Sequence, residues 1–126
     1  MSRTRPTIFI IDDDASVCRA LGRLLRSVGL VAETFATAEE FLRFTGESEP
    51  GCLILDVHLP GLSGLELQER LTSEGRHLAI VFITAYQEDQ VRQFALRAGA
   101  IAFLQKPFDE QALLNAVGRA IRGQPS

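Results

Sequence analysis

The sequence predicts a single α/β domain built on a doubly wound, five-stranded parallel sheet. Five short apolar runs rich in β-branched residues alternate with five segments whose apolar residues recur at helical spacing. Strands that alternate with helices form right-handed βαβ units, which place the strands in parallel and cover both faces of the sheet. With 126 residues and 46% hydrophobic content, the chain can build the core of one such domain.

The first predicted strand and helix flank three consecutive acids. Residues 7–11 form an apolar run that ends at Asp12, Asp13 and Asp14. The apolar residues that follow recur at helical spacing opposite arginines, and Gly29 supplies the end of this helix. We expect Asp14 to cap the helix, and Asp12 and Asp13 to lie at the carboxyl end of the strand.

The second strand is predicted over residues 31–36, and Glu33 within it indicates an edge position. Thr37 and Glu40 have the spacing of a capping box, in which each side chain accepts a hydrogen bond from the backbone of the other residue. The sequence therefore predicts that a second helix begins here and carries Phe41, Leu42 and Phe44.

The third strand is the apolar run 52–56, which follows a predicted turn at residues 49–51 and ends at Asp56. Ligands of open α/β sheets bind beyond the carboxyl ends of the strands, so Asp56 is the first candidate site residue. Ser63 and Glu66 form a second capping-box pattern, which predicts the start of the third helix.

The fourth strand is predicted over residues 78–83 and ends on Thr84. The helix predicted over 88–98 has acids at its start, an arginine near its end and Gly99 after it, which is the distribution that the helix dipole favours.

The fifth strand is predicted over residues 101–105 and is interrupted by Lys106 and Pro107. Asp109 can cap the last helix, whose apolar face consists of Leu113, Leu114, Val117 and Ile121. We expect a domain over 7–122, with an N-terminal tail over 1–6 and a tail or the start of a linker over 123–126.

Composition excludes several classes of function. The formal net charge of −3 and the isoelectric point near 5.4 argue against a nucleic-acid surface on this chain. No apolar h-region follows the first six residues, and no apolar run approaches the ~18 residues of a membrane span, so we expect a cytoplasmic protein without a signal peptide or membrane contact. Cys18 and Cys52 are expected to be buried, reduced thiols.

Side chains with reactive groups follow four of the five predicted strands, and parallel strands bring their carboxyl ends to one edge: Asp12, Asp13, Asp56, Thr84 and Lys106. Converging carboxylates repel each other unless a cation lies between them, and oxygen ligands suit Mg²⁺ or Mn²⁺. Lys106 is the only lysine among thirteen basic residues, and a compact ammonium fits beside phosphate oxygens where a guanidinium does not. The sequence therefore predicts phosphoryl transfer to an aspartate.

The same motifs resemble those of the receiver domains of two-component response regulators. The resemblance runs from about Thr7 to Arg122 and implies the flavodoxin-like (βα)5 fold with strand order 2-1-3-4-5. The end of the fifth strand is most similar to regulators of the nitrogen-fixation type, whose receiver precedes a helix-turn-helix output domain. The motifs that carry the resemblance are 10–14, 55–64, 83–85 and 103–108.

The resemblance also implies roles for individual residues. Asp56 would accept a phosphoryl group from the phosphohistidine of a sensor histidine kinase. Asp13 and Asp56 would bind the metal directly, Asp12 through water, and His58 through its main-chain carbonyl. Lys106 would contact the acyl phosphate.

Thr84 and Phe103 would form the switch pair, with the hydroxyl moving to the phosphoryl group and the ring turning inward. The switch would shift the population toward a state in which the fourth helix, fifth strand and fifth helix bind a partner or a second copy of the chain. DNA would be bound only by a separate output domain. The resemblance further implies a cis peptide at Lys106-Pro107.

The resemblance also implies that two positions, both occupied here by large side chains, set the lifetime of the phosphoryl group. His58 lies two residues after the phosphoacceptor and Tyr86 two residues after the switch threonine, and both would crowd the attacking water.

Three alternatives remain open at this point. The run Asp12-Asp13-Asp14-Ala15-Ser16 loosely fits haloacid-dehalogenase-type phosphatases, with Asp12 as nucleophile, although the chain is short for that family and shows no cap insertion. The second alternative is a receiver-like scaffold that is never phosphorylated. The third is a flavin-binding flavodoxin, although this sequence has no phosphate-binding loop after its first strand.

Overall fold

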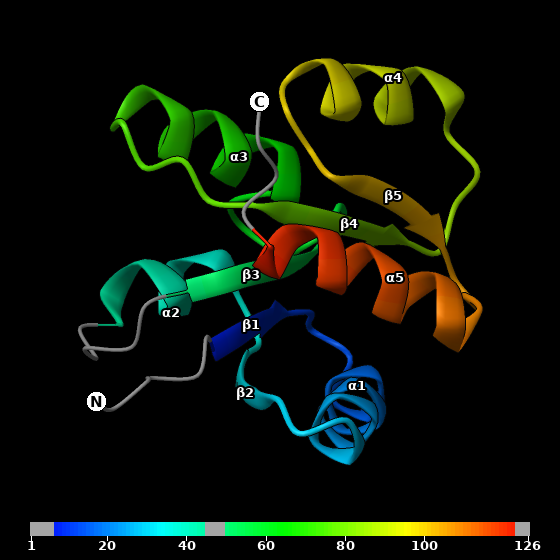
Figure 1. The fold of residues 1–126 in the computed structure, drawn as a ribbon. Coiled ribbons are helices and arrows are strands. Elements are labelled where there is room, and N and C mark those ends of the chain that lie inside the picture. The colour runs from blue at the N-terminus through cyan, green and yellow to red at the C-terminus, as the bar shows by residue number, and fades with distance from the viewer. Residues whose placement is uncertain (1–6, 45–49, 123–126) are drawn as a thin grey trace.

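The computed structural model describes residues 7–44 and 50–122 as a parallel five-stranded sheet with the order β2-β1-β3-β4-β5 and helices on both faces (Figure 1). The predicted fold class and strand order are confirmed. The expected tails over 1–6 and 123–126 lie outside the described residues. The strands are β1 (Thr7–Ile11), β2 (Val31–Phe35), β3 (Pro50–Asp56), β4 (Ile80–Thr84) and β5 (Ala102–Gln105). The helices are α1 (Ala15–Ser27), α2 (Ala38–Arg43), α3 (Gly64–Ser73), α4 (Asp89–Arg97) and α5 (Glu110–Ile121).

Alternation along the central strands divides the core into two layers. Ile8 and Ile10 of β1 face α1 and α5, whereas Phe9 and Ile11 face α2, α3 and α4. All five residues of β1 are buried, as they are in β4, because helices cover the sheet on both sides. The sheet therefore holds the carboxyl ends of β1, β3 and β4 at fixed positions.

Side-chain caps begin most of the helices as the sequence predicted. Asp14 accepts from the backbone N–H of Ser16, and Asp109 accepts from that of Ala112. Ser63 forms the full capping box with Glu66 at the start of α3.

The predicted capping box at the start of α2 is only half correct. Thr37 Oγ1 accepts from the backbone N–H of Glu40, as expected. The Glu40 carboxylate accepts from the N–H of Ala36 instead of Thr37, so it satisfies the backbone donor one residue earlier.

The turn predicted at residues 49–51 is wrong for its described part, because β3 already begins at Pro50. Residue 49 lies outside the described residues. Thr7 of β1 pairs with Pro50 and Ile8 pairs with Cys52, so Gly51 is the extra residue of an irregularity in the ladder. β4 and β5 begin at Ile80 and Ala102, slightly later than predicted.

Helix α4 has the fewest buried residues of the helices. Ala95 is its only fully buried residue, and Phe94 exposes 56% of its surface. Gln68 of α3 donates from Nε2 to the carbonyl of Ala95 at 3.2 Å and so links the two helices. The Gln68 Oε1 atom is buried and has no hydrogen-bond partner among the described residues.

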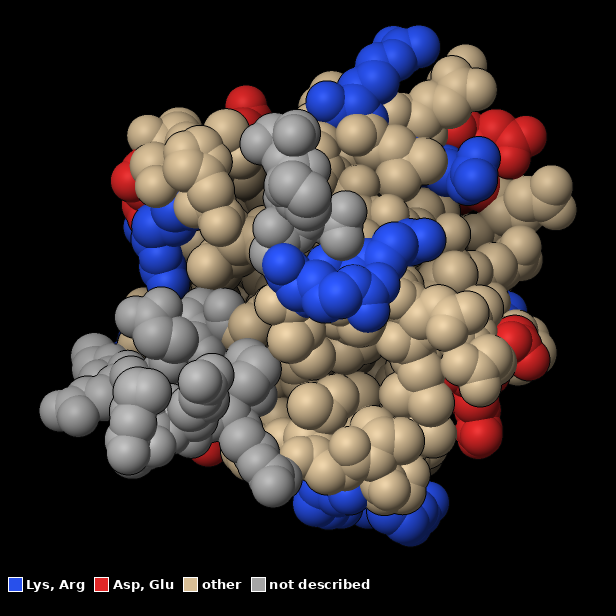
Figure 2. Space-filling view, viewed as in Figure 1, with Lys and Arg blue, Asp and Glu red and all other residues tan. Residues whose placement is uncertain are grey.

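The remaining expectations concern chemistry and charge. Cys18 and Cys52 are buried free thiols, as predicted, and burial raises the pKa of Cys52 to about 12. The Lys106-Pro107 peptide is cis. Within the described residues, no helix has both the length and the apolar character needed to cross a bilayer. Figure 2 shows lysine and arginine side chains in several separate groups on one face, with acidic side chains around them.

Candidate functional site

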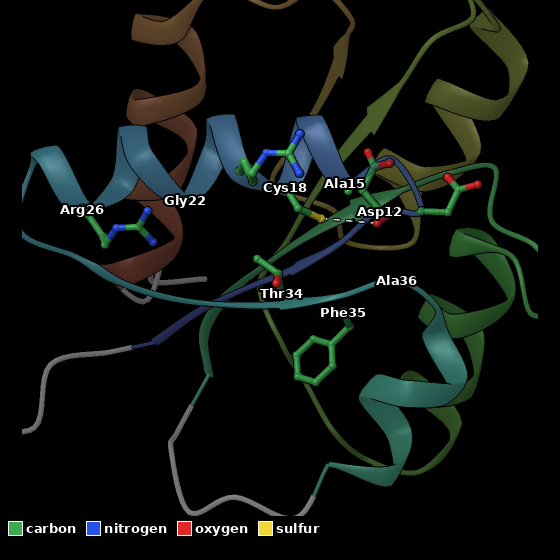
Figure 3. A pocket seen from close by; sticks show the side chains of 10 residues that line it. Asp12, Ala15, Cys18, Gly22, Arg26, Thr34, Phe35 and Ala36 are labelled. Atoms are coloured by element: carbon green, nitrogen blue, oxygen red, sulfur yellow. Dashed lines mark hydrogen bonds between the residues drawn. The ribbon is translucent and has the colours of Figure 1, made fainter.

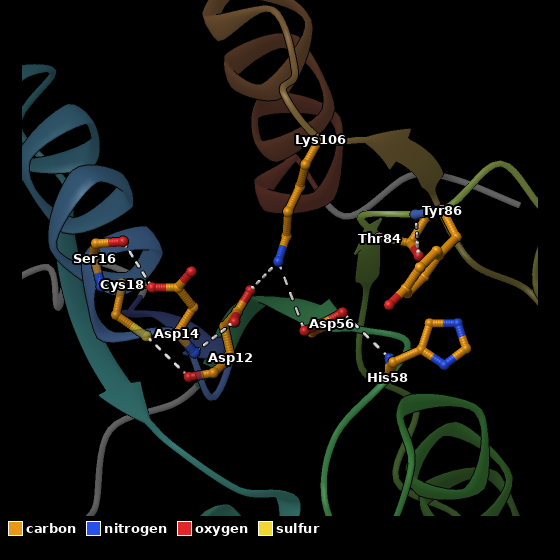
Figure 4. A network of polar contacts seen from close by, with 9 residues as sticks. All are labelled: Asp12, Asp14, Ser16, Cys18, Asp56, His58, Thr84, Tyr86 and Lys106. Atoms are coloured by element: carbon orange, nitrogen blue, oxygen red, sulfur yellow. Dashed lines mark hydrogen bonds and ion pairs between the residues drawn. The ribbon is translucent and has the colours of Figure 1, made fainter.

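Four polar side chains predicted to meet at one edge of the sheet do so in the structure (Figure 4). Asp12 follows β1, Asp56 ends β3, Thr84 ends β4 and Lys106 follows β5. The Lys106 Nζ atom lies 2.8 Å from Asp12 Oδ2 and 3.7 Å from Asp56 Oδ2. One ammonium therefore bridges two carboxylates that come from separate strands.

Asp12 is held rigidly by contacts to both its backbone and its side chain. Its backbone N–H donates to the carbonyl of Phe35 on β2, and its own carbonyl accepts from the Cys18 thiol at 3.3 Å. Its Oδ1 atom accepts from the N–H of Asp14 at 2.8 Å, while Oδ2 accepts from Lys106. Both carboxylate oxygens are thus already engaged.

Asp56 is 5% exposed, and its surroundings disfavour the ionised form of its carboxyl group. Burial and the nearby charge of Asp12 raise its pKa to about 6, although Lys106 and a hydrogen bond from the N–H of His58 to Oδ1 act in the opposite direction. A buried carboxylate of this kind gains from any additional positive charge placed beside it.

The acids form a group that could hold a metal ion. One carboxylate oxygen from each of Asp12, Asp13 and Asp56 lies within 4.8 Å of the others, and Asp13 is exposed to solvent. Hard oxygen donors at the rim of a sheet fit Mg²⁺, which retains several waters and needs few protein ligands. The residues present therefore fit a divalent cation.

Lys106 is protonated in this environment. Burial acts to lower its pKa, but the hydrogen bond to Asp12 and the charge of Asp56 outweigh it and hold the pKa above its usual value. The side chain is 19% exposed, so the charge is screened from water but remains reachable from the rim.

A cavity of about 350 Å³ between α1 and β2 opens onto the acids (Figure 3). Asp12 lies near one end of the cavity and Arg26 near the other, with Thr34 and Phe35 along the β2 side. Small molecules and ions in solvent can therefore approach the acids from this side.

The loop between β3 and α3 is tied down by a residue that the sequence did not indicate. Glu39 of α2 accepts from the N–H of Leu62 at 2.9 Å, and this hydrogen bond holds the pKa of Glu39 below its usual value. Gly61 adopts a φ of 71° directly beneath that carboxylate, and a Cβ atom there would meet Glu39 Oε2. The loop after Asp56 is therefore fixed to α2.

Gly64, at the start of α3, lies directly against the backbone of Asp56. Its N–H donates to the carbonyl of Val57 at 2.9 Å, and a Cβ atom at this position would collide with the carbonyl oxygen of Asp56. Only glycine permits this close approach, so Gly64 helps to set the position of Asp56.

His58 makes a second contact that was not predicted. Its ring is half exposed, and Nε2 lies 2.7 Å from Oε1 of Glu88, the N-cap residue of α4. The ring also packs edge-on against Tyr86, with 5.0 Å between the centroids. No pattern in the sequence indicated this contact, which joins residues thirty positions apart.

Thr84 and Phe103 lie on neighbouring strands near the same edge. Thr84 is fully buried, and its Oγ1 accepts from the N–H of Tyr86 at 3.2 Å. Phe103 pairs with Phe82 in the β4–β5 ladder and is half-buried beside a cavity of about 240 Å³ under the β4–α4 loop. Open space therefore lies beside the Phe103 ring.

Comparisons with known proteins agree with this geometry. Residues 8–118 match the family model of the response regulator receiver domain. Response regulator protein TodT of Pseudomonas putida is 42% identical over 125 residues, covering 99% of this chain and 55% of the relative. Transcriptional regulatory protein FixJ of Azorhizobium caulinodans is 38% identical over 110 residues, covering 87% of this chain and 52% of the relative.

A solved structure is similar over nearly the full length of both chains. The crystal structure of a response regulator receiver protein from Burkholderia phymatum is 44% identical and superposes with a TM-score of 0.82, covering 94% of this chain and 96% of that one. In contrast, the chain spans about half the length of the curated relatives that it matches.

Proposed function

Because this chain belongs to the response regulator receiver family, we propose that Asp56 accepts a phosphoryl group from the phosphohistidine of a sensor histidine kinase. An Asp56 carboxylate oxygen attacks phosphorus, the bond from phosphorus to the imidazole nitrogen breaks, and the imidazole leaves with the electron pair. The observation that carries the proposal is the buried Asp56 carboxylate beside the Lys106 ammonium and the two further acids.

The metal proposed for this reaction is Mg²⁺ or Mn²⁺. Asp13 and Asp56 would bind it directly, and the main-chain carbonyl of His58 would complete the protein ligands. Asp12 would bind through water, because both of its carboxylate oxygens already accept hydrogen bonds. When bound, the ion neutralises charge on the phosphoryl oxygens.

Lys106 supplies the second positive charge. Its ammonium is held between Asp12 and Asp56, where it can donate to a phosphoryl oxygen on Asp56 while remaining bound to Asp12. The role requires a compact cation, which accounts for a lysine in a chain that otherwise uses arginine.

The signal would pass through Thr84 and Phe103. The Thr84 hydroxyl would turn from the N–H of Tyr86 to the phosphoryl group, and the Phe103 ring would move inward. This rearrangement would favour a conformation in which α4, β5 and α5 bind a partner or a second copy of the chain.

We further propose that the chain is the regulatory part of a cytoplasmic transcription regulator whose separate output domain binds DNA. Support comes from the names of the relatives, which include transcriptional regulatory proteins about twice the length of the matched segment. The chain itself would be a phosphoacceptor with slow self-dephosphorylation, not an enzyme that turns over an external substrate.

Mapping the modified residue tests the proposal. The protein is incubated with acetyl phosphate and Mg²⁺, and the acyl phosphate is trapped with borohydride and located by mass spectrometry. Modification of Asp56 is expected. Modification of Asp12 would support the phosphatase reading, and no modification with either acetyl phosphate or a histidine kinase would reject the proposal.

A further inference from the structure

Glu88 occupies the N-cap position of α4 but does not cap that helix. Glu88 makes no side-chain hydrogen bond to the first turn of α4, unlike Asp14, Ser63 and Asp109 at their helices. Its carboxylate instead reaches His58, thirty residues earlier in the chain. The Glu88 carboxylate thus connects the start of α4 to the loop that follows β3.

The contact fixes the orientation of the His58 ring. An ionised carboxylate only accepts hydrogen bonds, so at 2.7 Å the Nε2 atom of His58 carries the hydrogen and donates it to Glu88. The interplanar angle between His58 and Tyr86 is 89°, an edge-on arrangement that holds the imidazole from a second direction. Rotation of the ring would break both interactions.

These side chains stand beside the proposed phosphoacceptor. Figure 4 shows His58 and Tyr86 next to the Asp56 carboxylate, on the side away from Lys106 and Asp12. The backbone N–H of His58 donates to Asp56 Oδ1, and the backbone N–H of Tyr86 donates to Thr84 Oγ1. The two rings therefore belong to residues whose backbones contact the site directly. The two rings therefore lie beside the site on this side.

We propose that Glu88 is a positioning residue for the Asp56 site: by holding the His58 imidazole against Tyr86, it closes one side of the site to water. This role rests on the phosphoacceptor function proposed above. Without the Glu88 carboxylate the imidazole rotates away from Tyr86, water reaches the phosphoryl group more often, and the group is lost faster. Glu88 acts through His58 and does not touch the reacting atoms.

The test compares phosphoryl loss from the parent, Glu88→Ala, Glu88→Gln and the control Asp89→Asn. Asp89 is the neighbouring exposed acid in the first turn of α4, so its variant removes a similar charge from the same place. Each protein is phosphorylated with acetyl phosphate and Mg²⁺, the donor is removed, and loss is followed by intact mass. We expect Glu88→Ala to accelerate loss about two- to five-fold, which is the size of effect that an exposed polar contact supports. We expect a smaller acceleration for Glu88→Gln and none for Asp89→Asn.

Two further readouts separate positioning from a general structural effect. In a His58→Ala background, Glu88→Ala should cause no additional acceleration, because the interaction that it removes is already absent. Tyr86 is the only tyrosine in a chain without tryptophan, so intrinsic fluorescence reports on its contact with His58. Its emission should change in Glu88→Ala but not in Asp89→Asn, even before phosphorylation.

The outcomes distinguish this role from the function on which it rests. A parent protein that accepts no phosphoryl group on Asp56 overturns both proposals. Normal phosphorylation with equal loss rates in the parent and both Glu88 variants overturns the role of Glu88 alone. Acceleration that persists undiminished in the His58→Ala background also overturns it, because Glu88 would then act without His58.

Discussion

The Lys106 ammonium lies closer to Asp12 than to Asp56, at 2.8 Å compared with 3.7 Å. Lys106 is therefore anchored by the acid that we propose binds metal only through water, and its remaining N–H groups are available on the side of Asp56. Because the Lys106 ammonium is already held in place before the reaction, no conformational freedom of this side chain is lost when the phosphoryl group arrives.

Replacing Lys106 should damage phosphorylation whether or not the charge is kept. We expect Lys106→Met to slow phosphorylation by acetyl phosphate about 100-fold or more, since it removes a fixed charge from the reacting centre. Lys106→Arg keeps the charge but its wide planar group does not fit between two carboxylates, so we expect at least a ten-fold loss. Rates measured by intact mass test both variants, and an arginine variant as fast as the parent would show that charge alone suffices.

The raised pKa of Asp56 predicts that replacing this residue increases the free energy of unfolding, and that the increase depends on pH. Because the pKa is about 6 in the folded protein and 3.8 for an unperturbed aspartate, the folded state binds the proton more tightly, and ionisation of Asp56 costs stability above pH 6. Asp56→Asn should therefore be more stable than the parent by on the order of 2–3 kcal/mol at pH 8 in EDTA. The difference should shrink as the pH falls through 6 and vanish below about 4, as measured by urea denaturation.

A divalent cation should offset the electrostatic repulsion among the clustered acids and so stabilise the folded protein. Mg²⁺ at about one hundred times its dissociation constant should stabilise the parent by about 2.7 kcal/mol, because only the folded protein assembles the three carboxylates. Asp13→Asn should lose most of this stabilisation while remaining folded, since Asp13 is exposed. Thermal denaturation with and without Mg²⁺ measures both, and equal stabilisation of the variant would place the ion elsewhere.

The two large side chains beside Asp56 should slow the loss of the phosphoryl group. We expect His58→Ala/Tyr86→Ala to lose it several-fold faster than the parent, because water gains access from the side that the two rings close. Loss is measured after removal of acetyl phosphate. A double variant no faster than the parent would mean that water approaches Asp56 from another direction, such as the cavity beside Asp12.

Gly64 and Gly118 should respond in opposite ways to the same substitution. Gly64→Ala forces a Cβ atom against the Asp56 carbonyl, so we expect a loss of about 1–3 kcal/mol in the free energy of unfolding and slower phosphorylation. Gly118 lies inside α5, where a Cβ atom would meet only the flexible end of Arg122, so Gly118→Ala should gain up to about 1 kcal/mol. Urea denaturation of both variants provides the comparison.

Much of this arrangement is predictable from the sequence because it depends on local patterns. The order of strands and helices, the caps at Asp14 and Ser63, and the residues at the strand ends all follow from periodicity and short motifs. The start of β3 was missed because Pro50 and Gly51 are typical of turns, whereas here the ladder tolerates them at an irregularity.

The contacts of the two loops could not be predicted in the same way. Glu39 contacts Leu62, 23 residues away in the sequence, and Glu88 contacts His58, 30 residues away. Neither pair produces a periodic pattern or a short motif in the sequence. Such contacts depend on how the folded backbone brings separate segments together. The local pattern at Glu88 indicated only a favourable interaction of an acid with the dipole of its own helix.

The sparse attachment of α4 has a consequence for how such a domain diversifies. With Ala95 as its only fully buried residue and Gln68 as a polar link to α3, α4 can open locally at a lower free energy than global unfolding. Its outward residues, including Phe94 at 56% exposure, contribute little to the core. Mutations can therefore change the outer face of α4 without destabilising the sheet that holds Asp56. Under the function proposed above, the residues that select a partner could then evolve separately from those that accept the phosphoryl group.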